Sequence, residues 1–171
     1  MIRPATPADA AAMREIERAA GAPFREIGLD VVADDEPPPV ALLAAYAAAG
    51  RAFVDERGTP GTPDRAPVGY LITEIVDGCA HLEQVSVLPR WRGHRVGAGL
   101  VERLAGWARD RRLPALTLTS FRDVPWNGPY YLRLGFREVV EPTPGLRAIR
   151  QAETDRGLDV WPRLAMRRDL T

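Results

Sequence analysis

Residues 80–104 read AHLEQVSVLPRWRGHRVGAGLVERL, and the rest of the chain is organised around them. In residues 80–87 apolar side chains stand among polar neighbours, a short run that favours a strand over a helix. Pro89 ends it, three arginines and a glycine follow, and from Val96 onward apolar residues recur at helical spacing. The order strand, basic turn, helix aims free backbone N–H groups and the positive end of a helix dipole at one point. Such a point binds phosphate.

Two familiar phosphate-binding loops do not fit this turn. A Walker-type loop needs Gly-Lys-Ser/Thr, but every basic residue of the chain other than histidine is an arginine. A dinucleotide fingerprint needs a third glycine, and counting from Gly97 and Gly99 places Glu102 there. A carboxylate at that position would face the pyrophosphate. The turn therefore indicates a phosphate site of another kind.

Residues 92–97, RGHRVG, resemble the acyl-CoA loop of the GNAT superfamily of N-acetyltransferases, whose pattern is Gln/Arg-x-x-Gly-x-Gly/Ala between a strand and a helix. Arg95 stands where the family usually has its first signature glycine. If the backbone has φ > 0 there, a side chain costs roughly 1 kcal/mol. A solvated arginine turn in front of an ordinary helix is the alternative interpretation.

A second motif at the expected distance favours the GNAT interpretation. Residues 127–136, NGPYYLRLGF, are similar to the family's Asn-x-x-Ala-x-x-x-Tyr-x-x-x-Gly-Phe region in a compact form. Asn127 matches the asparagine, Tyr131 the tyrosine, and residues 135–136 the closing Gly-Phe pair, while Tyr130 occupies the usual alanine place. A helix to about residue 112 and a strand over residues 115–120 are expected between the motifs. The resemblance is specific over residues 80 to about 140.

The resemblance implies an α/β (α+β) fold: a mixed, mostly antiparallel, twisted sheet of about six or seven strands flanked by helices on both faces. A chain of 171 residues with 46% apolar and 27% charged residues is expected to form one such domain over residues 1–171. Further strands are predicted at residues 2–4, 51–55, 68–76, 137–141 and 160–168. Helices are predicted from about residue 7 to 20, from 40 to 49 and from 146 to 156. Long loops are predicted at residues 30–39 and 56–67, and a hairpin turn at residues 77–78.

Composition narrows the classes of function and partner. Net charge is zero, which argues against a nucleic-acid partner recognised by overall charge. The single cysteine excludes an internal disulfide, and two histidines give no convincing zinc cluster, so no metal is expected. The sequence contains no membrane-length apolar stretch and no signal peptide, so a cytoplasmic protein without a membrane partner is expected.

The family transfers an acetyl group directly from acetyl-CoA to an amine. An amine with a pKa near 10.4 is protonated at neutral pH, and removing its proton costs roughly 4–5 kcal/mol, so a base or a water relayed to one is expected. His81 and Glu83 lie two residues apart on the predicted strand and share a face with Val85 and Val87. Because several family members use a carboxylate on this strand, Glu83 is the first candidate and His81 the second. Structural roles are the alternatives for both, and a β-bulge would put Gln84 or Ser86 in the place of Glu83.

The remaining site residues follow from the two motifs. CoA leaves as a thiolate whose thiol has a pKa near 8.5, so a phenol can donate a proton as the C–S bond breaks. Tyr131 matches the family's general acid, with a core aromatic as the alternative. A backbone N–H near Val87 would stabilise the oxyanion. The positions that the resemblance assigns to acetyl-CoA binding are Val85, Val87, Arg92, Gly93, Arg95, Val96, Gly97, Ala98 and Asn127.

The acceptor is the least determined part of the prediction. Residues 30–36 carry four carboxylates, which either attract a cationic amine or form a solvated loop. A small amine, a peptide N-terminus and a protein lysine stay open as substrates, as does a homodimer. Two other classes of function stay open: a catalytically silent acyl-CoA-binding or regulatory module, and a nucleotide or nucleic-acid binder that uses the arginines of residues 90–95. The zero net charge and the failed phosphate-loop patterns weigh against the nucleic-acid binder.

Overall fold

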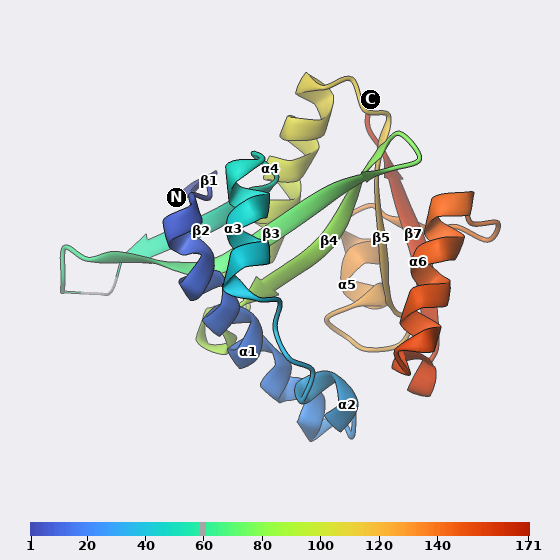
Figure 1. Cartoon of the computed structure of the whole chain (residues 1–171), viewed down its shortest axis with the longest axis horizontal. Helices are drawn as coiled ribbons and strands as arrows, with labels where there is room; N and C mark the ends of the chain where they lie inside the picture. The colour runs from blue at the N-terminus through green and yellow to red at the C-terminus, as the bar shows by residue number, and fades with distance from the viewer. Residues whose placement is uncertain (59–60) are drawn as a thin grey trace. The chain divides into compact units, whose positions relative to one another are not determined.

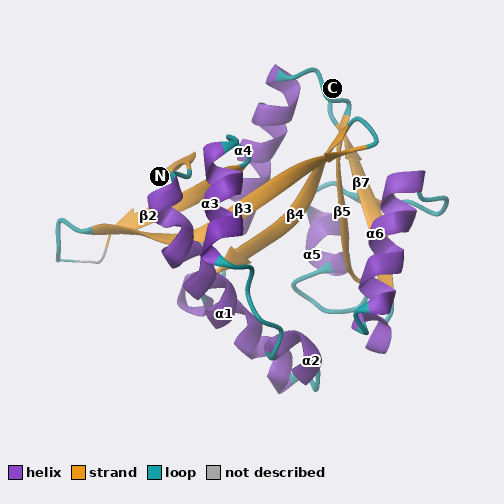
Figure 2. Cartoon of the chain, viewed as in Figure 1, coloured by secondary structure: helices purple, strands orange, loops and turns teal. Residues whose placement is uncertain are grey.

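The computed structural model describes residues 1–58 and 61–171. In this part of the chain seven strands hydrogen-bond in the order β1-β2-β3-β4-β5-β7-β6. β4 and β5 are parallel, whereas the pairs β1/β2, β2/β3, β5/β7 and β6/β7 are antiparallel. A mixed, mostly antiparallel sheet flanked by helices confirms the predicted fold class, and Figure 2 distinguishes its strands from its helices.

Figure 1 shows the elements in chain order. The strands are β1 (Ile2–Pro4), β2 (Ala52–Gly58), β3 (Arg65–Val76), β4 (Cys79–Val87), β5 (Ala115–Phe121), β6 (Arg137–Glu138) and β7 (Arg163–Asp169). The α-helices are α1 (Ala10–Glu26), α2 (Asp30–Ala33), α3 (Val40–Ala48), α4 (Val96–Asp110), α5 (Gly128–Arg133) and α6 (Pro144–Asp155). The short 3-10 helices are η1 (Pro7–Asp9), η2 (Pro89–Trp91) and η3 (Leu158–Val160).

The chain forms two compact units, each made of two segments. Unit 1 comprises Met1–Thr73 and Glu83–Leu104, and unit 2 comprises Glu74–Leu82 and Ala105–Thr171. β3, β4 and α4 therefore contribute residues to both units. That residues 1–171 form one domain stays a prediction.

α1 is longer than predicted. Its start is fixed by the Asp9 carboxylate, which accepts hydrogen bonds from the Thr6 N–H at 2.7 Å and from Arg3 at 2.8 Å. The predicted end near residue 20 is wrong, because the helix continues through Pro23 to residue 26. Pro23 is buried near the end of the helix. There it removes one backbone hydrogen bond, and burial of the ring offsets that loss.

The acidic segment over residues 30–39 is only in part the predicted loop, since its first four residues form α2. Asp30 lies in the first turn of α2, where a carboxylate suits the positive end of the helix dipole. Asp34 forms an ion pair with Arg25, and Glu36 pairs with Arg14 at 3.0 Å. Both arginines belong to α1, so two of the four carboxylates connect this segment to α1 through ion pairs.

The strands β2 and β3 are longer than predicted and shorten the loop between them. They pair from Gly58 and Arg65 onward, with a register shift between Asp55 and Glu56. Residues 59 and 60 of the predicted loop lie outside the described residues. The predicted turn between β3 and β4 is confirmed, because residues 77 and 78 have φ of 49° and 75°. Positive φ at both positions is what a type I′ hairpin turn requires.

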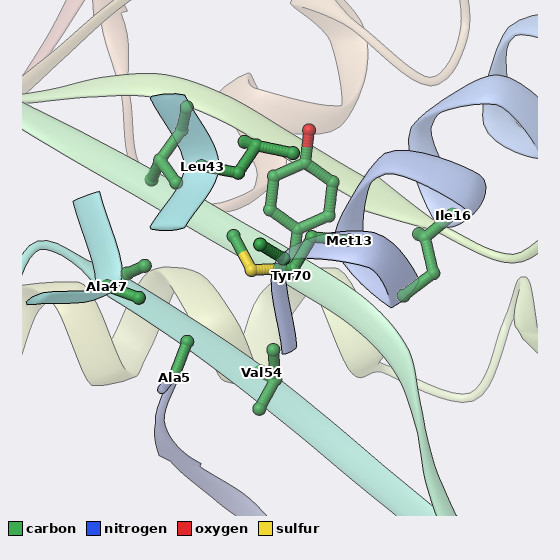
Figure 3. Close-up of a cluster of buried hydrophobic side chains, with 10 residues drawn as sticks. Ala5, Met13, Ile16, Leu43, Ala47, Val54 and Tyr70 are labelled. Carbon is green, nitrogen blue, oxygen red and sulfur yellow. The ribbon is translucent and has the colours of Figure 1, made fainter. Parts of the chain in front are cut away.

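Helices cover both faces of the sheet within unit 1. On one face Met13 and Ile16 of α1 and Leu43 of α3 pack with Tyr70 of β3 and Val54 of β2 (Figure 3). On the opposite face α4 approaches the sheet at Gly69, where an added Cβ would lie 2.6 Å from Val96 Cγ1. Gly69 and Tyr70 are neighbours on β3, so strand alternation turns them to opposite faces. The close approach of α4 therefore requires glycine at position 69.

In unit 2, β5 pairs with the first residues of β4 on one side and with β7 on the other. The strand predicted over residues 137–141 is shorter in the structure, where β6 consists of two residues. The strand predicted from residue 160 begins at Arg163, since η3 ends at residue 160 and Pro162 has no N–H to donate. α6 starts two residues earlier than predicted, at Pro144, because proline suits the first helical position.

Candidate active site

The end of β4 presents two different faces within unit 1. Gln84 donates a hydrogen bond from Nε2 to Ser86 Oγ at 2.9 Å, and the Ser86 hydroxyl hydrogen-bonds the phenol of Tyr70. Tyr70 belongs to the face covered by α1 and α3. Strand alternation therefore turns Glu83, Val85 and Val87 toward the opposite face, the side of α4. Glu83 is exposed there, while the two valines are partly buried.

The turn after β4 delivers the chain to the start of α4. The Trp91 N–H donates to Leu88 O at 2.8 Å, and the Gly99 N–H donates to Arg95 O at 2.9 Å as the first turn of α4 closes. The amides of Val96, Gly97 and Ala98 precede that bond, and the first amides of a helix have no carbonyl acceptor within it. They point along the helix axis with the positive end of its dipole.

The side chains around this helix start suit an anion. Arg92 and Arg95 are exposed, and Val96 is buried and anchors the helix against the sheet. Gly93 and Arg95 have φ of 79° and 59°, so the loop takes a left-handed conformation at the position where the family has glycine. Arg95 therefore carries the strain, of roughly 1 kcal/mol, that a side chain pays in this region. The residues fit a diphosphate held mainly by main-chain N–H groups.

His81 belongs to unit 2, where it is opposite Thr117 in the β4/β5 register. Its Nδ1 lies 2.9 Å from Thr117 Oγ1, and the side chain is buried. Burial lowers the pKa of the imidazole to about 4, and the nearby Glu74 carboxylate offsets this in part. The ring is neutral at neutral pH, and a group with so low a pKa is a weak base for an ammonium ion. This geometry favours the structural role of His81 over the catalytic one.

The second motif is built around α5 in unit 2. The backbone doubles back before this helix so closely that a Cβ on Gly128 would lie 2.4 Å from Arg122 O. Asn127 stands at the helix start, and its backbone O accepts the Tyr131 N–H at 3.0 Å. The Asn127 side chain donates from Nδ2 to Trp126 O at 3.1 Å. The motif thus fixes both residues through the backbone of one short helix.

Tyr131 is buried, with 7% of its surface exposed. Its ring contacts those of Tyr130 and Phe136 edge to face, with centroids 5.4 and 5.7 Å away. Burial, with a smaller contribution from Tyr130, raises the pKa of the Tyr131 phenol above its ordinary value of 10. The phenol therefore keeps its proton at neutral pH, which is the state that a general acid needs. Tyr130 is half-buried and carries Arg133 over its ring.

Sequence reasoning missed two features of unit 1. One is Gly69, which admits α4, and the other is Glu17 of α1, whose carboxylate accepts a hydrogen bond from the buried Tyr70 hydroxyl. Glu17 lies four residues after Met13, on the same side of α1, so an acidic residue in line with a buried apolar one was the available signal. In the described ranges no group of three or more His, Cys, Asp and Glu side chains is placed to hold a metal ion. No described helix combines the length and apolarity needed to cross a membrane.

The fold is similar to those of solved acetyltransferases. A Mycobacterium tuberculosis protein solved in complex with CoA superposes with a TM-score of 0.67 at 18% identity, covering 100% of this chain and 99% of that one. The Escherichia coli ribosomal-protein-S18-alanine N-acetyltransferase gives 0.66 at 18% identity, covering 100% and 94%. A Brucella melitensis GNAT family acetyltransferase in complex with acetyl-CoA gives 0.57 at 26% identity, covering 80% and 82%.

A sequence model of the acetyltransferase (GNAT) family matches residues 11–136. The matched region spans α1 to the end of the second motif and includes the whole β4-turn-α4 segment. Acetyl-CoA is therefore the cosubstrate, and acetyl transfer the class of reaction, as the two motifs predicted. The chain belongs to the GNAT family of acetyltransferases.

Proposed function

We propose that this acetyltransferase moves the acetyl group of acetyl-CoA onto a primary amine by direct attack of the amine nitrogen. The observation that carries this proposal is the start of α4, where open amides, exposed arginines and a left-handed loop follow β4 directly. That arrangement supports a bound diphosphate at the end of a strand along which a thioester arm extends. We expect the reaction in the cytoplasm, with a small molecule or a peptide as acceptor.

The acetyl-CoA contacts are assigned within this frame. The amides of Val96, Gly97 and Ala98 bind the diphosphate, and the exposed Arg92 and Arg95 add positive charge beside it. Gly93 gives the loop its shape. The backbone at Val85 and Val87 pairs with the pantetheine arm as a further strand would. Asn127 is a further cofactor contact, assigned from the second motif.

Two groups handle protons in the transfer. Tyr131 donates its phenolic proton to the sulfur as the C–S bond breaks, which its buried and protonated state supports. The acceptor ammonium must lose a proton before attack, and the sequence assigns that role to Glu83 through water, ahead of His81. The low pKa of His81 argues for a carboxylate rather than the imidazole.

The test is thiol release from acetyl-CoA across a panel of amines, combined with a binding titration. We expect saturable acetyl-CoA binding and amine-dependent release of CoA together with an acetylated product. Binding without turnover on any amine would instead support a catalytically silent acyl-CoA module. Preferential binding of ATP or DNA would contradict both.

A further inference from the structure

Four polar side chains form a continuous path through the apolar side of unit 1. Gln84 Nε2 donates to Ser86 Oγ at 2.9 Å, and the Ser86 hydroxyl hydrogen-bonds the Tyr70 phenol. The Tyr70 hydroxyl donates to Glu17 Oε2. The path therefore leads from β4 across β3 to α1, through residues that are far apart in the sequence.

Tyr70 is the sealed middle of this path, and exposure increases on either side of it. Tyr70 is fully buried and Ser86 is 5% exposed, whereas Glu17 and Gln84 are half-buried. The Tyr70 ring lies among Met13, Leu43 and other core side chains (Figure 3). A phenylalanine would fill that space without a polar atom to satisfy, so the hydroxyl is a costly choice for packing.

The hydrogen bonds of the path share one direction. Gln84 Nε2 has protons to donate and no lone pair to accept with. The Tyr70 hydroxyl has one proton and donates it to the Glu17 carboxylate, so in its hydrogen bond with Ser86 it accepts and Ser86 donates. A proton added at Ser86 can therefore deliver another to the Glu17 carboxylate by a shift along each bond.

The β4 end of this path lies where the proposed function needs a proton to leave. Ser86 adjoins Val87, whose backbone is assigned to the thioester arm, so an amine attacking there lies along the same strand. Glu83 lies three residues before Ser86, so its side chain is on the opposite face of the strand, the face of α4.

We propose that Glu17 is the final acceptor of the proton that the acceptor amine loses, and that Ser86 and Tyr70 carry it there. The inference rests on the proposed function and gives Glu17 the role that the sequence assigned to Glu83. The ammonium N–H passes its proton to Ser86 Oγ, Ser86 passes its own to Tyr70 Oη, and Tyr70 passes its own to Glu17 Oε2. The freed nitrogen lone pair attacks the thioester carbonyl, and the half-exposed Glu17 returns the proton to water.

The charges around Glu17 suit this role. Burial raises the pKa of its carboxyl above the ordinary value, and the Asp35 carboxylate adds to the rise. The Tyr70 hydrogen bond and the Arg14 guanidinium oppose it. Arg14 also donates to Pro38 O at 3.2 Å and pairs with Glu36, so its charge is shared with the segment after α2. Glu17 therefore holds a proton more readily than a solvated glutamate does.

The test is the pH dependence of kcat at saturating acetyl-CoA and amine, for the wild type and for Glu17→Gln, Glu17→Asp and Glu15→Gln. General acid–base groups contribute about 10²–10⁴-fold, and kcat reports their pKa values in the substrate complex. We expect Glu17→Gln to lower kcat about 10²-fold and to remove the acidic limb, with the KM for acetyl-CoA unchanged. Glu17→Asp keeps a limb because it keeps a carboxylate. Glu15 is exposed on the same helix and pairs with Arg18, so Glu15→Gln matches the wild type.

Several outcomes overturn the inference and leave the proposed function standing. These are a Glu17→Gln variant that keeps its limb and a kcat within about twofold of the wild type, and a limb lost from Glu83→Gln but kept by Glu17→Gln. If Glu17→Gln does not fold by circular dichroism, Tyr70→Phe replaces it, and an unchanged kcat in that variant also overturns the path. A wild type that acetylates no amine overturns the proposed function together with this inference.

Discussion

Each unit holds a buried phenol, and the two phenols have different surroundings. Tyr70 of unit 1 is fully buried, and its hydroxyl is committed to the Glu17 carboxylate. Tyr131 of unit 2 is nearly as buried, but the neighbours that the structure places on its ring are the aromatic rings of Tyr130 and Phe136. Burial raises the pKa of both phenols. A raised pKa by itself therefore does not identify a general acid, because the partner decides where the proton can go.

The two motifs also differ in which residue occupies a left-handed backbone position. The second motif has glycine at its left-handed position, Gly135 with φ of 90°, whereas the loop of unit 1 has Arg95 with φ of 59°. Glycine takes this conformation without strain, and arginine does not. The unit 1 loop therefore keeps a side chain at a strained position where the motif of unit 2 keeps none.

The largest effect that separates the two phenols is expected from Tyr131→Phe. Removing the hydroxyl should lower kcat about 10²–10³-fold, because the thiolate then leaves without a proton donor. The ring and its aromatic contacts remain, so acetyl-CoA affinity and thermal stability should change little. Steady-state kinetics and a binding titration measure the two quantities. An unchanged kcat would mean that Tyr131 is a core aromatic, and Tyr130→Phe provides the matched comparison.

Tyr70→Phe should differ from Tyr131→Phe in being a stability variant as well. It leaves the half-buried Glu17 carboxylate without its phenol donor, which costs about 1–3 kcal/mol of unfolding free energy. It also interrupts the path from Ser86, so kcat falls about as far as in Glu17→Gln. Denaturant unfolding and kcat are measured on the same preparation. Equal stability of the two phenylalanine variants would contradict the contrast between the phenols.

A third test asks whether burial also governs the pKa of the His81 imidazole, another buried titratable group of unit 2. The pKa of His81 is lowered from its ordinary value near 6.5 to about 4, so the unfolded chain binds more protons than the folded one between these values. The contribution of His81 to the free energy of unfolding is therefore fully present above pH 6.5 and is lost as the pH is lowered toward 4. Between pH 7 and pH 5 the wild type should lose about 2 kcal/mol more than His81→Gln, from 1.36 kcal/mol per pKa unit. Equal losses in urea unfolding at both pH values would show that the imidazole is hydrated in the fold.

The sequence predicted the β4-turn-α4 segment because everything that defines it is local. Pro89, the glycines and the apolar spacing after Val96 act within a few residues, so strand, turn and helix appear where expected. The path from Glu17 to Gln84 could not be predicted in this way. Sheet pairing and helix packing bring its members together, and Glu17 and Tyr70 are 53 positions apart in the sequence. The same limit explains α1, where packing of Pro23 overrides its local preference to end a helix.

The smallest effect concerns the strained position of unit 1, and a pair of variants at one residue isolates it. Arg95→Ala and Arg95→Gly both remove the guanidinium, so any loss of phosphate contact is common to them. They differ at the backbone, where alanine keeps the Cβ that φ of 59° disfavours and glycine does not. We expect the glycine variant to be more stable than the alanine variant by about 1 kcal/mol, whereas at an ordinary helical or extended position the order is reversed. Thermal unfolding of the two proteins measures the difference, and an alanine variant of equal or greater stability would mean that the loop relaxes out of the left-handed region once the arginine is gone.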